Sequence, residues 1–111
     1  MPQGDFHAGY AQRVITPPLD PPVYLAGFGQ NRVAKTIHDD LYARALALQM
    51  GETTIALVAL DLLGLARNHC LEIEARVKQS QPNIQLIIAA RTSITGRIRL
   101  VYGGRTCRLR V

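Results

Sequence analysis

The chain has no tryptophan, only two cysteines, and six aromatic residues in all, four tyrosines and two phenylalanines. Cys70 and Cys107 follow no metal-binding or redox spacing, and two cysteines cannot build a disulfide framework. No apolar run reaches the ~18 residues that a transmembrane helix needs. The N-terminus, MPQGDFHAGY, also lacks the basic start and apolar stretch of a signal peptide, so the cytoplasm is the default expectation.

Size and composition limit the chain to one small domain. A domain of 111 residues buries about 65% of the surface of its unfolded chain. The chain is 48% hydrophobic and 19% charged, which is typical of ordinary globular proteins. These values exclude a large multidomain enzyme and a disordered or collagen-like chain.

Acidic residues are absent from residues 91–111, which carry six arginines and no lysine. Residues 1–90 carry seven basic and eight acidic residues. The formal net charge of +5 therefore comes entirely from the C-terminal segment. We divide the chain into a near-neutral domain over residues 1–90 and an Arg-rich tail over residues 91–111.

The first half of the domain has the pattern of β structure. Strands are expected at residues 8–16, before a proline cluster, and at residues 23–29. Alternation in residues 41–50 and a β-branched run in residues 53–65 predict a β-hairpin, with Gly51 in its turn. The second hairpin strand is apolar on both faces, which predicts a central position covered on both sides.

The second half predicts a strand-helix-strand unit. Residues 66–80 form a helix in this interpretation, with Asn68 or Gly64 as candidate N-cap, and residues 84–90 form a buried strand. Four residues at helical spacing make its apolar stripe: Ala66, Cys70, Ile73 and Val77. Because such crossovers are right-handed, we predict a small mixed α/β sheet with one hairpin and one crossover.

Four segments within residues 6–90 carry a resemblance to a known family. They are VITPPL (14–19), LAGFG (25–29), IHDDLYARALAL (37–48) and TTIALVALDLLGL (53–65). Their order and approximate spacing resemble the N-terminal region of the neutral/alkaline non-lysosomal ceramidase family. The resemblance implies a partial domain, incomplete relative to that of the family, whose remaining catalytic groups lie beyond residue 111.

The family implies an amidase that hydrolyses the N-acyl amide bond of ceramide to a sphingoid base and a fatty acid. Zinc, held partly by histidine, is the implied cofactor of the intact protein, because it lowers the pKa of bound water. A ceramide-like lipid is the implied substrate. Family relatives are often secreted or membrane-associated, so the resemblance leaves the location of this chain open.

The chain departs from the family at the metal site. After the strand that matches IQLIIAA (84–90), the family has Thr-His-x-His-x-Gly-Pro-Asp-Thr, whereas residues 91–104 read RTSITGRIRLVYGG, without histidine. If the coding sequence of this segment is read in a shifted frame, beginning at the third base of the Ala90 codon, its possible codons can encode a series of residues similar to the family motif. We therefore hypothesise that residues 91–111 are translated out of frame. We assign no metal ligand and expect no activity from the chain alone.

Three residues are candidates for the vicinity of a site: His38, Asp39 and Asp61. In an extended chain only His38 and Asp40 would share a face, and two ligands make no zinc site, so a role in a surface turn or at the entry to a strand is favoured over a metal role. Asp61 ends a predicted buried strand and resembles an acidic position of the family. A hydrogen-bonded structural aspartate is the equally acceptable interpretation.

The tail supports a rival function. Residues 97–102 and 105–110 flank Gly103-Gly104 and predict a basic β-hairpin, in which Arg97 and Arg99 share one face and Arg108 and Arg110 share one across the turn. Such a ribbon suits a small protein that binds nucleic-acid phosphates or an anionic membrane surface. Nucleic acid is the less favoured partner, because the tail has one aromatic residue and no known nucleic-acid module.

Overall fold

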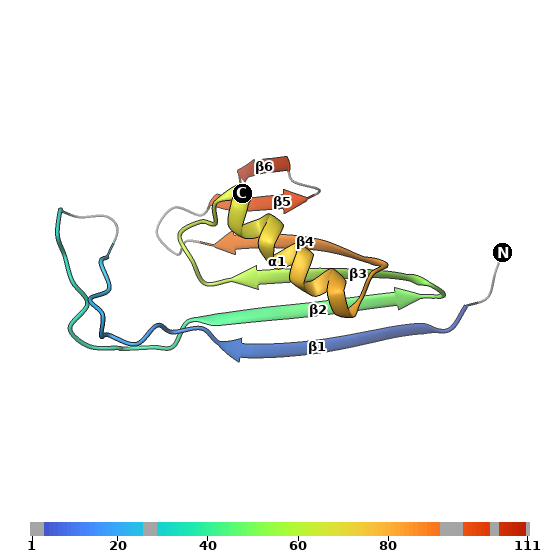
Figure 1. Ribbon diagram of the computed structural model, residues 1–111, viewed down its shortest axis with the longest axis horizontal. Helices are drawn as coiled ribbons and strands as arrows, with labels where there is room; N and C mark the ends of the chain where they lie inside the picture. The colour runs from blue at the N-terminus through green and yellow to red at the C-terminus, as the bar shows by residue number, and fades with distance from the viewer. Residues whose placement is uncertain (1–3, 26–28, 92–96, 103–104, 111) are drawn as a thin grey trace.

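The computed structural model describes residues 4–25, 29–91, 97–102 and 105–110, the last two ranges and Arg91 by their backbone alone. Within these ranges, six strands and one helix follow one another along the chain (Figure 1). Their bounds are β1 Phe6–Val14, β2 Tyr42–Met50, β3 Thr53–Leu60, α1 Arg67–Ser80, β4 Ile84–Arg91, β5 Arg97–Tyr102 and β6 Arg105–Arg110. The strands form one open sheet in the order β1-β2-β3-β4-β5-β6.

The sheet is mixed, as predicted. β3 and β4 pair in parallel and are joined through α1, whereas every other neighbouring pair is antiparallel. The β2–β3 hairpin is confirmed, with Met50 opposite Thr53 across the turn. Gly51 has a φ of 59°, a left-handed conformation that glycine adopts without steric strain. The prediction of a small α/β fold with one hairpin and one crossover is confirmed.

Helix α1 lies where the apolar stripe predicted it, but its N-cap is different. The cap residue is Ala66, which has extended dihedral angles and makes no side-chain capping hydrogen bond. The prediction of Asn68 or Gly64 as cap is therefore wrong, because Asn68 already lies inside the helix. Ion pairs at i, i+4 run along α1, from Arg76 to Glu72 at 2.7 Å and from Lys78 to Glu74 at 2.9 Å.

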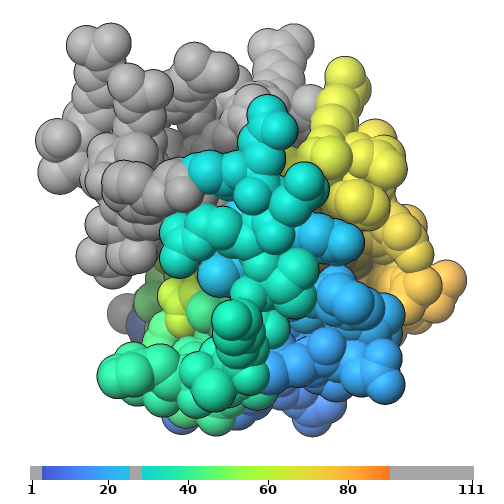
Figure 2. Space-filling view, turned by 90° about the vertical axis from the view of Figure 1, so that its left-hand side faces the viewer, coloured from blue at the N-terminus to red at the C-terminus, as the bar shows by residue number. Residues whose placement is uncertain are grey.

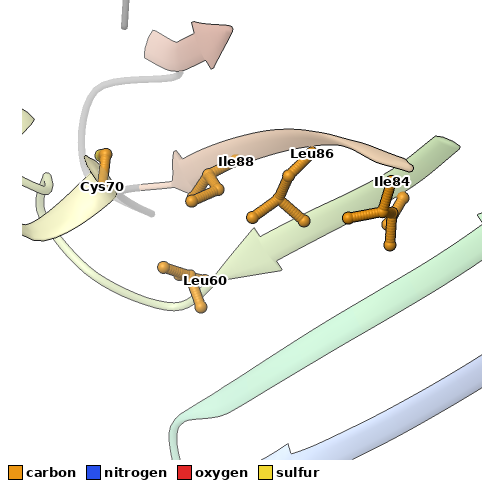
Figure 3. Close-up of a cluster of buried hydrophobic side chains, with 6 residues drawn as sticks. Leu60, Cys70, Ile84, Leu86 and Ile88 are labelled. Carbon is orange, nitrogen blue, oxygen red and sulfur yellow. The ribbon is translucent and has the colours of Figure 1, made fainter. Parts of the chain in front are cut away.

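The hydrophobic core lies between α1 and one face of the sheet (Figure 3). Its buried residues are Ala56, Leu60, Cys70, Ile84, Leu86 and Ile88. In β3 these residues alternate with exposed ones, among them Ile55 and Leu57 at 36% and 41% exposure. The prediction that this strand is covered on both faces is wrong, because the one described helix packs on one side of the sheet.

The opposite face of the sheet, called the open face below, carries apolar side chains. Register places Tyr10, Leu46, Leu57 and Ile87 side by side across four strands on this face. The radius of gyration is 16.4 Å, whereas a compact domain of this length has about 13 Å. The larger value reflects an elongated molecule, with principal extents of 56 × 28 × 23 Å.

Between β1 and β2 the chain leaves the sheet as an extended excursion, described over residues 15–25 and 29–41 (Figure 1). The strand predicted at residues 23–29 is wrong for the part that the structure describes: Tyr24 forms an isolated bridge with Val33. Backbone N–H groups of Leu25 and Ala34 donate across it, at 2.7 and 2.9 Å. The prolines just before this segment have no N–H to extend such a ladder. Residues 26–28 of that prediction lie outside the described residues.

The tail forms the predicted hairpin at the level of the backbone. β5 pairs with β4 through residues such as Val101 opposite Ile88, and β6 pairs with β5. We also expect residues 91–111 to pack poorly against the core, because a segment read out of frame has no selected complementarity to it. This expectation lies outside the described residues, since it concerns side chains of the tail.

Candidate functional site

Polar side chains gather at the end of the sheet where β1 and β3 finish and β2 begins. This is the end from which the excursion leaves, and Figure 2 views the molecule from that side, with the excursion in front. The residues that interact there are Thr16, Asp40, Tyr42, Arg44 and Asp61. Antiparallel pairing of β2 with both neighbours brings these segments, far apart in sequence, to one place.

Asp61 is the central residue of this end. It follows directly after β3 and opposite the first residue of β2, so its backbone N–H donates to the Tyr42 carbonyl at 3.0 Å. Its Oδ2 accepts from the Tyr42 backbone N–H at 2.9 Å and from Nη1 of Arg44 at 3.1 Å. The carboxylate thus closes the β2–β3 ladder and is paired with a cation.

Arg44 is held from two directions. Its guanidinium pairs with Asp61 and lies 4.6 Å from the centroid of the Tyr42 ring, within the range of a cation–π contact. The side chains of Arg44 and Asp61 are 41% and 35% exposed. Water therefore reaches this pair, and a polar group of a ligand placed at this end of the sheet would reach it too.

Thr16 ties the two ends of the excursion together. Its Oγ1 donates to Oδ1 of Asp40 at 2.7 Å and accepts from the backbone N–H of Leu41 at 2.8 Å. Next to it, the N–H of Ile15 donates to the Leu41 carbonyl at 2.8 Å. These bonds close the long loop at its base and set where β2 begins.

His38 and Asp39 lie at the surface of the excursion. Their side chains are 95% and 86% exposed, and Nδ1 of His38 is 2.8 Å from Oδ2 of Asp39. The chain bends at both residues, so these neighbours meet although adjacent residues of an extended strand would not. Their interactions are with each other, whereas Asp61 interacts with Tyr42 and Arg44.

The described residues do not fit a zinc site. Among them no group of three or more histidine, cysteine, aspartate or glutamate side chains is placed to hold a metal ion. Catalytic zinc takes three protein ligands and structural zinc takes four. The His38–Asp39 pair would supply two, and the Asp61 carboxylate is engaged by Arg44.

An apolar groove of about 250 Å³ lies on the open face beside Arg44. Its lining is almost wholly apolar and includes Tyr10, Leu46, Leu57 and Ile87. The groove thus presents hydrocarbon almost throughout, and the half-exposed Arg44–Asp61 ion pair lies beside it. Such an arrangement suits a molecule with an apolar part and a polar end, because the apolar part would contact the groove and the polar end would reach the ion pair.

Sequence reasoning found Asp61 but missed its partners. The turn at Gly51 could have predicted these partners, because a two-residue hairpin loop sets Tyr42 opposite Asp61. Arg44 then follows two residues later on the same face as Tyr42. Thr16 had no local signal, because its partners Asp40 and Leu41 are 24 and 25 residues away.

Within the described residues, no helix has the length and apolar character needed to cross a membrane. No protein-family model, curated protein or solved structure matches this chain. The function proposed below therefore relies on the residues of this chain and on the geometry of this site.

Proposed function

We propose that this chain is the N-terminal part of a ceramidase-like zinc amidohydrolase and that it has no activity of its own. The observation that carries the proposal is the order of four family-like segments, VITPPL, LAGFG, IHDDLYARALAL and TTIALVALDLLGL, within residues 6–90. The parent activity would be hydrolysis of the N-acyl amide of a ceramide-like lipid.

Two features of the structure are compatible with such a parent. Asp61, the acidic position of the resemblance, follows a central strand at one end of the sheet, where α/β folds often carry functional groups. The apolar groove beside Arg44 would accept hydrocarbon. Neither feature supplies a nucleophile or a metal ligand set, which is why we propose an inactive fragment.

Resequencing the coding DNA around codon 90 is the direct test. We expect codons for residues 91–104 that, one base out of register, encode the histidine-containing segment of the family and continue beyond it. Codons that exclude those histidines would contradict the frame hypothesis. A downstream reading frame that continues but does not resemble the family would contradict the proposed parent protein.

The assay for activity uses the purified chain with added zinc and a short-chain fluorescent ceramide. We expect no release of fatty acid above the rate with zinc alone, because the described residues hold no metal ligand set. Hydrolysis that depends on both chain and zinc would overturn the claim that the fragment is inactive. The Asp61→Asn variant would then show whether that carboxylate takes part.

The β5–β6 hairpin favours one alternative function. Its register pairs Arg97 with Arg110 and Arg99 with Arg108, so four arginine positions belong to one face of a two-stranded ribbon. A cluster of this kind attracts phosphate-rich partners through a salt-dependent interaction. On this alternative the chain is a small basic protein that binds an anionic membrane surface or nucleic acid.

Binding to anionic vesicles and to single-stranded nucleic acid, measured over a range of salt concentrations, tests the alternative. The alternative predicts affinity that falls steeply with salt and is lost when Arg108 and Arg110 become alanine. Arg32→Ala and Arg67→Ala, both in residues 1–90, are the matched controls. Binding that is absent, or equally sensitive to the control changes, would contradict it.

A further inference from the structure

The outer edge of β1 is a long strand edge on which no described element lies (Figure 1). All nine residues of β1 are exposed. Its register with β2 is continuous from Phe6 to Val14, so no bulge interrupts it. Such an edge presents a row of unpaired N–H and C=O groups, which a further strand can pair with.

The hydrogen-bond pattern shows which groups are free. Ile15 donates to the carbonyl of Leu41, its register partner, which makes this a hydrogen-bonded pair of the β1–β2 ladder. Hydrogen-bonded pairs alternate along an antiparallel ladder, so the odd-numbered residues of β1 bond to β2. The N–H and C=O groups of the even-numbered residues therefore point to the free edge. These residues are Phe6, Ala8, Tyr10, Gln12 and Val14.

The free groups are self-complementary about Tyr10, the middle residue of the strand. In an antiparallel pair of two β1 strands centred there, Tyr10 meets Tyr10 of the other copy, Ala8 meets Gln12 and Phe6 meets Val14. Every such pair joins two even-numbered residues, so each exchanges two backbone hydrogen bonds. A two-fold axis through Tyr10 thus satisfies the whole free edge, which is the pattern of an isologous interface.

Side chains favour the same pairing. The even-numbered residues face the open side of the sheet, where Phe6 and Tyr10 are both 64% exposed and Val14 is 48% exposed. Pairing would bring these apolar side chains together and join two open faces into one. The opposite edge of the sheet, β6, is shorter and carries Arg105, Arg108 and Arg110. β1 has one arginine, no lysine and no proline, so it lacks the usual protection of a strand edge.

We propose that two copies of this chain associate through β1, antiparallel and two-fold symmetric about Tyr10, to form one continuous sheet. The contact is about 30 Å long and about 10 Å deep, roughly 300 Å² per copy, against ~800 Å² per partner in a standard stable interface. The dimer is therefore concentration-dependent, with a dissociation constant of about 10–500 μM.

The mass of the full chain in solution, measured by analytical ultracentrifugation over a range of concentrations, is the first test. We expect it to rise from 12.2 kDa toward twice that value. Gln12→Pro removes an N–H that points to the free edge, so the monomer keeps its β1–β2 ladder while the dimer loses hydrogen bonds. We expect this variant to keep its circular dichroism spectrum and to dimerise at least tenfold more weakly.

Tyr10→Lys and Tyr24→Lys form a matched pair, because the two tyrosines are 64% and 67% exposed and only Tyr10 lies on the edge. Lysine at position 10 would place two like charges side by side at the two-fold axis, and we expect loss of the dimer. Tyr24→Lys should dimerise like the parent chain.

Amide hydrogen exchange tests which backbone N–H groups of β1 the dimer contact protects. On dilution, exchange at Ala8 and Tyr10 should accelerate, whereas exchange at Gly9 and Ala11, whose N–H groups bond to β2, should not change. A chain that stays at monomer mass up to about 500 μM would overturn the proposal. So would a folded Gln12→Pro variant that dimerises as well as the parent, since its association would use another surface.

Discussion

Asp61 combines two tasks at the residue scale. It closes the β2–β3 ladder by accepting the Tyr42 N–H at 2.9 Å, and it positions Arg44 beside the apolar groove. The first task belongs to folding and the second shapes a surface. One oxygen, Oδ2, accepts from both partners. A substitution that keeps an acceptor oxygen but removes the negative charge should therefore separate the two tasks.

We expect Asp61→Ala to lower the free energy of unfolding by about 1 kcal/mol. The Tyr42 N–H loses its acceptor, and the effect is moderated because the Asp61 side chain is 35% exposed and water can reach the site. Asp61→Asn keeps an acceptor oxygen and loses only a half-exposed ion pair, so its effect should stay within about 0.5 kcal/mol. Urea unfolding followed by circular dichroism measures both. Equal losses in the two variants would show that the ion pair, rather than the hydrogen bond to Tyr42, is the stabilising contact.

At the scale of the element, α1 begins without help from its own side chains. Ala66 occupies the N-cap in an extended conformation, and the first turn contains no acidic residue. Helix N-termini are stabilised by a capping oxygen and by negative charge. The helix therefore depends on the packing of Cys70, Ile73 and Val77 against the sheet.

This dependence predicts a stabilising substitution. Ala66→Asp should raise the free energy of unfolding by about 1 kcal/mol, because the new carboxylate caps free N–H groups and interacts with the helix dipole. Ala75→Asp, at an exposed position inside the same helix, is the matched control and should be neutral or destabilising. Thermal unfolding compares the three chains. A destabilised Ala66→Asp chain would contradict the assignment of the cap.

The two faces of the sheet predict different responses to the same truncation. Leu86 is 6% exposed under α1, whereas Leu57 is 41% exposed on the open face. Leu86→Ala should therefore lower the free energy of unfolding by about 2–4 kcal/mol, and Leu57→Ala by less than about 1 kcal/mol. Urea denaturation measures both. Similar losses would show that the open face is covered in solution.

At the scale of the whole molecule, the one helix among the described residues covers one side of a long sheet, and no described element covers the other side. No residue among those whose burial is described has a side chain less than 2% exposed. A core of this kind offers limited stability, because the apolar area removed from water drives folding. The open face also carries the groove, so the exposed apolar surface is concentrated on one side.

We expect the folded chain to enhance the fluorescence of an apolar dye such as ANS while keeping a cooperative unfolding transition. The dye should bind the open face, so replacing Leu46 and Leu57 together by glutamine should lower the enhancement at least twofold. The unfolding midpoint should change little, because both side chains are already about 40% exposed. Unchanged enhancement in this variant would place the dye elsewhere, and a non-cooperative transition would indicate a loosely packed state.

Local sequence determined most of the elements of this protein, with the strand expected at residues 23–29 as the exception. Alternation, the turn at Gly51 and the apolar stripe of α1 each act over a few residues, and the structure contains the hairpin, the helix and β4 where they predicted them. Strand pairing and burial act between residues far apart in the chain, so tertiary structure decided the rest. It left Leu57 exposed on a face that local hydrophobicity suggested was covered. It also joined Arg44 to Asp61 and Thr16 to Asp40, contacts that exist only once the strands have paired.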